Sequence, residues 1–377
     1  MAKKKKIGLN LSKMKNEAPK KAIVKKKKTK EKKPVLAKQK LQNRDDLIDS
    51  YLVAIDGAQL LGGHGMARKI RGVLSTQVPG LNAAIGRGGI PLGRLSILAG
   101  PEGTGKTTLA LHLAAQCQAQ GGVVIYVDTE YKLDPDYAQA IGVDTKRLVI
   151  LQPPHLEAVF MAGEHVIEQA KKYRTDVGVR IPILFIQDSM NSSISKAEYE
   201  GEHGDDFYSP QARVYSKSLP KFMPKVSKED VALFFLGQER KKIGVIFGDD
   251  FSLIGGSAPK HYSSLIMRIK RIGLVKKDNQ QIASRVTIEC VKNQIAPPFR
   301  KTECLIEFGK GINPYHSLAH SALQLGIIEQ SGAWYSYKGK QLGQGLDKTA
   351  LFLKKHRKLY EKIEKKLYKK SFVKSAK

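Results

Sequence analysis

Cysteine is scarce in this sequence, which has three, Cys117, Cys290 and Cys304, among 377 residues. They lie far apart and form no C-x-x-C pair, so a disulfide-built scaffold is excluded and a cysteine metal site is disfavoured. We expect three reduced thiols inside the core of a cytoplasmic protein.

Long hydrophobic runs are also missing. No stretch of about 18 apolar residues occurs, so the sequence predicts no transmembrane helix and no membrane partner. The N-terminus lacks the apolar segment of a secretory signal, and the absence of arginine from residues 1–43 argues against a mitochondrial presequence.

Acidic residues are few: 35 stand against 65 lysines and arginines, and the formal net charge is +30. Most of the excess lies at the two ends of the chain. Residues 1–43 hold 17 lysines and two glutamates, and residues 348–377 hold 12 basic and two acidic residues. Because a segment as polar as 1–43 cannot bury a core, we predict a disordered tail. Its charge favours attachment to nucleic acid phosphates over a solubilising role.

The middle of the chain alternates short apolar strands with helices. Strands are predicted at 94–100, 123–128, 183–188 and 231–238, with a helix after the first and another at 157–173. This alternation is typical of parallel β-α units, in which ligands bind at the carboxyl ends of the strands. Two later stretches, 265–275 and 284–291, predict an antiparallel hairpin joined by polar residues and added to the sheet.

Four segments are expected along the chain. They are a lysine-rich tail at 1–43, a subunit-contact segment at 44–72, a core at 73–312 and a small, mainly helical C-terminal domain at 313–377 that ends in a basic helix. Apolar residues recur at helical spacing over 44–61, and this stripe fits either the chain's own core or a neighbouring subunit.

A glycine-rich turn follows the first core strand. The string GPEGTGKT matches G-x-x-x-x-G-K-[ST] between a strand and a helix, as a phosphate-binding loop requires. The backbone N–H groups of such a loop surround the β-phosphate, its lysine reaches the β- and γ-phosphates, and its threonine binds Mg²⁺. ATP and Mg²⁺ are therefore the predicted cofactors. The predicted nucleotide-binding residues here are Gly100, Pro101, Glu102, Gly103, Thr104, Gly105, Lys106, Thr107 and Thr108.

Polar residues end the other core strands. Asp188, at the end of the third strand, is placed to hold Mg²⁺ together with Thr107. Glu130 follows the second strand, where a carboxylate can orient and deprotonate the water that attacks ATP. Gln238 ends the fourth strand, and it either contacts the γ-phosphate or serves as a structural amide.

Two stretches near these strands lack clear periodicity. They are EYEGEHGDDFY, at 198–208, and ERKKIGVIFGDDFSLIGGS, at 239–257. Loops of this length inside a compact domain are usually functional. Their aromatic and basic residues favour a grip on the backbone of a single nucleic acid strand, although the four acidic residues of the first stretch argue against a simple phosphate clamp.

Six strings occur in one order between about Val73 and Gly345: GPEGTGKTTL, VDTEYKLDPDYA, KAEYEGEHGD, GQERKKIGVIFG, VKNQIAPPF and GAWYSYKGKQLGQG. Together they resemble a bacterial-type RecA-family DNA strand-exchange recombinase. The resemblance implies an α/β fold: a P-loop ATPase core with a twisted, mostly parallel sheet, an N-terminal polymerisation helix and a small C-terminal α/β domain. It also implies an ATP-dependent helical filament on single-stranded DNA that pairs with homologous duplex DNA, exchanges strands and hydrolyses ATP when DNA is bound.

The resemblance also implies roles for individual residues. The catalytic group comprises Lys106, Glu130 as the catalytic glutamate, Gln238 as the nucleotide sensor and Lys292, which reaches the ATP of the neighbouring subunit. Asp134 and Tyr137 contact adenine, and Asp188 supports the magnesium ion. Two DNA-binding loops are implied, and their residues are Glu200, Gly201, Tyr208, Arg213, Arg240, Lys241, Lys242, Ile243, Gly255 and Gly256.

Several residues depart from the family pattern. Gln294 stands where the family usually has a second interface lysine, which predicts slower hydrolysis or weaker activation by ATP. His261 replaces a common interface aromatic. A basic C-terminal end replaces the acidic tail of many members, which predicts readier duplex capture with steep salt sensitivity. The long lysine arm suggests a divergent recombinase, either bacterial or phage-encoded, that acts in the cytoplasm of a bacterial cell or of a phage-infected host.

Two other functions share some of these features. A ring-forming DNA helicase has the same phosphate loop, glutamate and acid, but not the late hairpin or the VKNQIAPPF and GAWYSYKG strings. A non-catalytic DNA-binding module would not need Lys106, Thr107, Glu130 and Asp188 together. Mediator and single-strand-binding proteins are further candidate partners of a recombinase.

Overall fold

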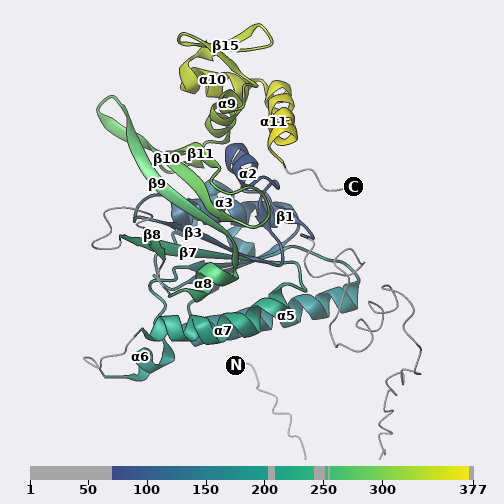
Figure 1. The fold of residues 1–377 in the computed structure, drawn as a ribbon, viewed down its shortest axis with the longest axis vertical. Coiled ribbons are helices and arrows are strands. Elements are labelled where there is room, and N and C mark those ends of the chain that lie inside the picture. The colour runs from purple at the N-terminus through teal and green to yellow at the C-terminus, as the bar shows by residue number, and fades with distance from the viewer. Residues whose placement is uncertain (1–69, 203–208, 242–250, 254, 373–377) are drawn as a thin grey trace, which may run out of the picture. The chain divides into compact units, whose positions relative to one another are not determined.

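The computed structural model describes residues 70–372 except 203–208, 242–250 and 254. The predicted tail at 1–43 and helix at 44–61 lie outside the described residues. Within them, ten strands form one sheet in the order β12-β11-β10-β9-β3-β7-β6-β4-β5, with β8 paired to β7 (Figure 1).

The centre of this sheet is parallel. The parallel strands are β3 (Leu95–Gly100), β4 (Val123–Asp128), β5 (Leu148–Leu151), β6 (Ile183–Asp188), β7 (Val231–Lys241) and β9 (Ser263–Lys277). Antiparallel strands extend or edge it: β8 (Phe251–Leu253), β10 (Gln280–Asn293), β11 (Lys301–Glu307) and β12 (Gly311–Ile312). The predicted α/β class with a mostly parallel sheet is confirmed.

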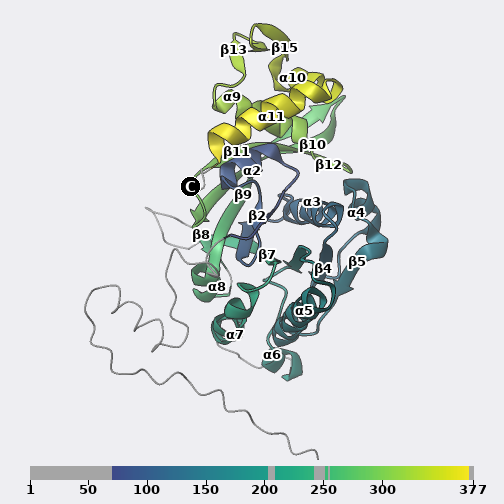
Figure 2. The same cartoon turned by 90° about the vertical axis from the view of Figure 1, so that its right-hand side faces the viewer.

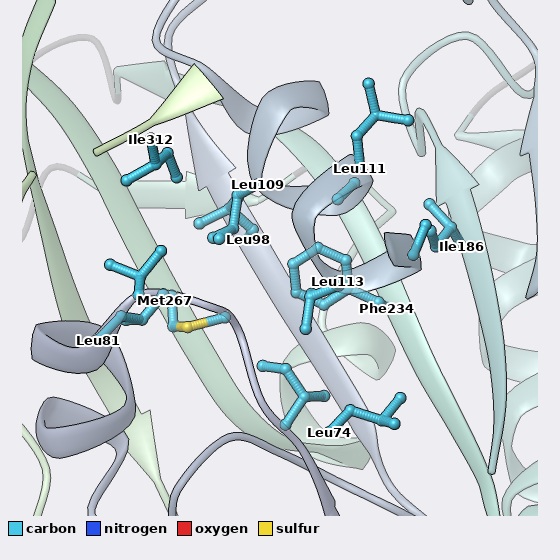
Figure 3. Close-up of a cluster of buried hydrophobic side chains, with 14 of the residues drawn as sticks. Leu74, Leu81, Leu98, Leu109, Leu111, Leu113, Ile186, Phe234, Met267 and Ile312 are labelled. Atoms are coloured by element: carbon cyan, nitrogen blue, oxygen red, sulfur yellow. The ribbon is translucent and has the colours of Figure 1, made fainter. Parts of the chain in front are cut away.

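Helices cover both faces of the sheet, which explains why the central strands are apolar throughout. One face packs α2 (Pro79–Ile85), α3 (Lys106–Ala119) and α4 (Pro135–Ile141), and the other packs α5 (Leu156–Val177) and α7 (Pro210–Val226) (Figure 2). Figure 3 shows the first layer, where Leu109 and Leu113 of α3 lie among Leu98, Ile186 and Phe234 of three neighbouring strands.

Short elements complete the core. They are β1 (Val73–Leu74), β2 (Ile90–Pro91), the 3-10 helix η1 (Thr145–Arg147), α6 (Lys196–Glu200) and α8 (Ala258–Tyr262). Strands β4 and β6 match the predicted ranges at both ends. The predicted helix at 157–173 is longer as α5, because Gly178 adopts a left-handed φ of 74° and ends it.

The hairpin of β9 and β10 is longer than predicted. Its turn consists of Asp278 and Asn279, whose φ angles of 50° and 61° suit a tight two-residue turn. The polar residues on both sides, expected to form the connection, are paired strand residues instead. Their polarity reflects the exposure of the hairpin to solvent, since ladder hydrogen bonds require only backbone groups.

The C-terminal part contains a small sheet, as the α/β domain implied by the resemblance requires, although the helical periodicity alone did not predict it. It consists of β13 (Glu329–Ser331), β14 (Trp334–Tyr337) and β15 (Lys340–Gln344), packed with α9 (Pro314–Gln324), α10 (Gly345–Lys355) and α11 (Arg357–Ser371). These strands are short and mostly polar, so they give little alternation. The basic helix α11 buries Tyr360, Ile363 and Leu367 in the core of this module.

The three cysteines are free and buried, as predicted. Burial raises the pKa of each thiol to about 12, which leaves them protonated and unreactive at neutral pH. Among the helices of the described residues, none combines the length and apolar character that crossing a membrane demands.

Candidate active site

The phosphate loop joins β3 to α3 at the carboxyl edge of the parallel strands. Two of its glycines lie where the neighbouring residues leave no room for a side chain. A Cβ on Gly100 would lie 2.2 Å from the carbonyl oxygen of Ile269, and one on Gly105 would lie 2.3 Å from Cδ1 of Ile306. Gly105 also has a φ of 92°, which residues with a side chain rarely adopt. These two glycines therefore let the loop pack closely against β9 and β11.

Lys106 begins α3 and is held at the loop. Its Nζ donates hydrogen bonds to the carbonyl oxygens of Gly100 at 3.0 Å and Pro101 at 2.8 Å. Burial lowers the pKa of this amine, while the charges of Asp188, Glu130 and Glu102 act against that shift. The first N–H groups of α3, which have no partner within the helix, lie beside this amine and favour an anion.

Asp188 accepts two hydrogen bonds on one carboxylate oxygen. The hydroxyl of Thr107 donates to Oδ2 at 2.8 Å, and the hydroxyl of Tyr126 donates to the same atom at 2.6 Å. Burial raises the pKa of Asp188, and these two donors oppose the shift. A hydroxyl and a carboxylate side by side form the hard oxygen set that Mg²⁺ prefers, so these residues fit the ion.

Glu130 lies after β4 and is fixed from two directions. Its Oε1 accepts a hydrogen bond from the hydroxyl of Ser189 at 2.7 Å, and its Oε2 lies 3.4 Å from Nζ of Lys132. The turn that carries it wraps around the buried carboxylate of Asp128, which accepts the N–H groups of Glu130 and Leu133 at 3.3 and 3.2 Å. The glutamate is therefore held beside the phosphate loop.

Gln238 lies next to the start of the phosphate loop, because β7 pairs Gln238 with Gly100 in the parallel ladder. Its backbone N–H donates to Oδ1 of Asn191 at 2.8 Å. Strand β7 then continues to Lys241 and pairs with β8. One strand thus connects the phosphate loop to the second expected DNA-binding segment.

These residues line one cavity of about 340 Å³. Its polar lining includes Lys106, Thr107, Glu130, Asp188 and Gln238. Tyr137, Ile306 and Phe308 add apolar surface, and the remaining lining residues are Glu102, Gly103, Gly105, Thr108, Tyr126, Asp128, Lys132, Leu133 and Ser284. Aromatic and aliphatic side chains beside a phosphate-binding turn suit the flat apolar base of a nucleotide.

The two residues expected to contact adenine differ in their placement. Tyr137 lines the cavity, and its hydroxyl lies 2.9 Å from that of Thr108. Asp134 is exposed and does not line the cavity. Its Oδ1 accepts the N–H groups of Asp136 and Tyr137 at 2.9 and 3.2 Å, so it caps the first turn of α4.

Several residues of the cavity were not singled out from the sequence. Tyr126 lies within an apolar strand, which predicts only burial. Asp128 is the polar end of the same strand, but no ligand-binding role was assigned to it. Ile306 and Phe308 come from β11 and the turn after it, far along the chain. Only the closeness of β11 to the loop, through Ile306 and Gly105, reveals their part in the site.

Lys292 lies away from this cavity within the same chain. Its Nζ donates to the backbone carbonyl oxygens of Lys260 and His261, the latter at 3.3 Å. It is absent from the cavity lining. His261 itself is exposed on α8, and Gln294 is exposed just beyond β10. A role for Lys292 in hydrolysis therefore requires a second copy of the chain.

The expected DNA-binding residues fall into three groups. Glu200 ends α6, Gly201 follows it and Arg213 is exposed on α7, whereas Tyr208, Lys242 and Ile243 lie outside the described residues. Arg240 and Lys241 pair with β8, so the expectation of irregular chain throughout 239–257 is wrong.

Gly255 and Gly256 follow the described end of β8. Their φ angles of 94° and 77° place both in the left-handed region, where glycine is favoured. A Cβ on Gly255 would lie 2.8 Å from the ring of Tyr215 on α7. The second expected DNA-binding segment therefore returns to the core against the helix that carries Arg213.

Both the ATPase core and the C-terminal module of this chain match known protein families. The model of the RecA N-terminal domain matches residues 55–313, and that of the RecA C-terminal domain matches residues 317–371. The curated relative Protein RecA of Rhodococcus opacus (strain B4) is 38% identical over 332 residues, which cover 86% of this chain and 92% of that protein. Protein RecA of Staphylococcus aureus (strain JH9) is 39% identical over 311 residues, covering 82% of this chain and 86% of that protein.

These matches confirm the resemblance carried by the six strings. They cover the sheet, the phosphate loop, the hairpin and the small C-terminal module. The chain belongs to the RecA family.

Proposed function

We propose that this protein is an ATP-dependent homologous recombination protein. It forms a helical filament on single-stranded DNA, pairs that strand with homologous duplex DNA and promotes strand exchange, with DNA-stimulated ATP hydrolysis. The observation that carries this proposal is the convergence of the phosphate loop, Glu130, Asp188 and Gln238 on one cavity in a chain of the RecA family. Neither the family models nor the relatives favour a ring-forming helicase.

The cavity residues fit ATP and Mg²⁺. Bound Mg²⁺ supplies positive charge that offsets the charge of the β- and γ-phosphates. Thr107 and Asp188 would hold this ion, with Asp188 acting through water. Lys106 adds a second positive charge at the loop. Glu130, fixed by Ser189, orients the attacking water and accepts its proton.

DNA binding is coupled to the nucleotide through elements that leave this cavity. Gln238 contacts the γ-phosphate, and β7 transmits its position to the segment that begins at Lys241. Lys292, which does not line the cavity of its own chain, completes the site of the neighbouring subunit of the filament in this proposal. Mediator and single-strand-binding proteins are proposed partners, and the bacterial or phage-infected cytoplasm is the proposed location.

A strand-exchange assay tests this function directly. Wild-type protein should transfer a labelled strand between homologous DNA molecules when ATP and Mg²⁺ are present, and the Lys106→Ala variant should not. Electron microscopy with single-stranded DNA and a slowly hydrolysed ATP analogue should show helical filaments. Closed rings together with an absence of strand exchange would instead support a helicase.

A further inference from the structure

Tyr126 lines the nucleotide cavity although it belongs to a buried strand. It lies on β4 directly opposite Ile186 of β6, and two residues later Asp128 lies opposite Asp188. Side chains two residues apart share a face of the sheet. The long side chain of Tyr126 therefore runs along the strand toward the carboxyl edge, and its hydroxyl meets the carboxylate of Asp188.

This contact is short and enclosed. The hydroxyl of Tyr126 lies 2.6 Å from Oδ2 of Asp188, and the tyrosine is 1% exposed. Its ring packs in the same apolar cluster as Ile186 and Leu109, which fixes the direction of the hydroxyl. Burial, together with the charge of Asp188, raises the pKa of the phenol well above its usual value, so the phenol remains a donor at neutral pH.

We propose that Tyr126 is a positioning residue for the magnesium site, because its hydroxyl holds the Asp188 carboxylate in the orientation that binds a metal-bound water. The inference rests on the proposed function, in which Thr107 and Asp188 hold Mg²⁺. Tyr126 touches neither the nucleotide nor the ion in this role. It acts through Asp188 alone.

The two hydroxyls that donate to Asp188 have different roles when the nucleotide and Mg²⁺ bind. The hydroxyl of Thr107 would bind Mg²⁺ through an oxygen lone pair and can still donate its O–H to Oδ2, so it serves both the ion and the carboxylate. The hydroxyl of Tyr126 has no second task. It therefore remains on Oδ2 and leaves the other carboxylate oxygen directed at the water of the ion. Without the hydroxyl of Tyr126, the carboxylate would keep only the hydrogen bond from Thr107 and would lose a charge-assisted hydrogen bond that fixes its orientation.

The Tyr126→Phe substitution tests the proposal, since it removes only the hydroxyl. The measurement is the Mg²⁺ concentration that gives half-maximal binding of a fluorescent methylanthraniloyl derivative of ATP. We expect this concentration to rise about tenfold to a hundredfold, as loss of one hydrogen bond to a charged group predicts. Binding of the analogue in EDTA should change less than about twofold, because the phosphate loop is intact.

A double-mutant cycle with Asp188→Asn shows whether Tyr126 acts through Asp188. Asp188→Asn should itself raise the half-saturating Mg²⁺ concentration, and adding Tyr126→Phe should raise it no further. Tyr215→Phe is the matched control: this buried tyrosine, on the opposite face of the sheet, accepts a hydrogen bond from Gln187 at 3.1 Å. Its loss should leave the Mg²⁺ dependence unchanged, and thermal unfolding should show that every variant is folded.

The outcomes separate this inference from the proposed function. If Asp188→Asn raises the half-saturating concentration and Tyr126→Phe does not, Tyr126 has no positioning role and the magnesium assignment stands. Additive effects of the two substitutions would also overturn the role, because Tyr126 would then act independently of Asp188. If Asp188→Asn has no effect, the magnesium assignment itself is wrong and the role of Tyr126 is lost with it.

Discussion

Glu130 depends on neighbours that set its position without touching ATP. Asp128 holds the turn, and Ser189 holds the carboxylate at 2.7 Å. Because Glu130 is the proposed base, Glu130→Gln should lower DNA-stimulated ATP turnover by a factor of about 10² to 10⁴. Nucleotide affinity should change little, since the amide keeps the size of the side chain. Turnover and nucleotide binding measured on the same preparation check this, and turnover within tenfold of wild type would exclude the base role.

Gln294 offers a second test at a single residue. Its backbone N–H is bound to the carbonyl oxygen of Ser264 at 2.8 Å, and the residue is exposed. A lysine there would restore the second positive charge at the subunit boundary. We predict that Gln294→Lys raises DNA-stimulated turnover, whereas the uncharged Gln294→Met does not. No increase in the lysine variant would show that the missing charge does not limit hydrolysis.

Individual site residues can be predicted from the sequence where they belong to a local motif. The glycine spacing of the phosphate loop and the polar ends of β4, β6 and β7 identify residues that the fold brings together. Tyr126 and Phe308 are not identified as site residues from the sequence, because an aromatic residue on or beside a strand resembles an ordinary core residue. Asp134 shows a different difficulty. The resemblance implies an adenine contact for it, whereas its carboxylate caps α4 in the structure.

The attachment of α3 to Gln77 and to β12 depends on a neutral histidine, His112. Nδ1 of His112 lies 2.8 Å from Oε1 of Gln77, and Nε2 accepts the N–H of Ile312 at 2.8 Å. Nδ1 therefore carries the proton and donates, while Nε2 carries none. Protonation of Nε2 would break the bond to β12. Burial accordingly lowers the pKa of His112 to about 4.

This shift makes the stability of the chain fall in acid. The folded-state pKa is depressed below the unfolded value, so between these values the unfolded chain binds more protons. Stability should therefore fall as the pH decreases from about 6.5 to 4, by up to about 3 kcal/mol from this residue. Denaturant unfolding of wild type and His112→Gln across that range checks the sign. Parallel pH curves would show that His112 does not contribute.

The elements that sequence predicts well are those buried on both faces. Strands β4 and β6 have sharp boundaries because each begins directly after a glycine or a proline and ends in an aspartate. The arms of β9 and β10 and the strands of the C-terminal sheet are exposed on at least one side, so their polarity imitates a loop. Helix α7 contains Pro220 and Pro224 in its interior, and its apolar packing through Tyr215 and Phe222 outweighs those breakers.

At the scale of the molecule, the basic C-terminal end is a structural helix with a charged face. Removal of residues 348–377 would delete buried residues of α10 and α11, so it would not isolate the effect of charge. Lys362, Lys365 and Lys369 are exposed at helical spacing on α11 and can be neutralised instead.

Replacing these three lysines with glutamine should weaken duplex binding and lower its salt dependence. The slope of log affinity against log salt should fall by about 0.9 for each DNA phosphate that the variant no longer neutralises. A double variant that carries Lys171→Gln and Lys172→Gln, on the exposed side of α5, is the control for loss of positive charge elsewhere on the protein. An unchanged slope in the α11 variant would exclude α11 from duplex binding.

We propose that ATP is hydrolysed between two protomers, and turnover by mixed filaments measures this. Lys106→Ala lacks the lysine of its own phosphate loop, and Lys292→Ala lacks the lysine offered to its neighbour. Each variant alone should show almost no DNA-stimulated turnover. An equal mixture should recover about a quarter of wild-type turnover, since that fraction of interfaces joins an intact loop to an intact Lys292. Full activity of Lys292→Ala alone, with no gain on mixing, would show that each protomer hydrolyses ATP without its neighbour.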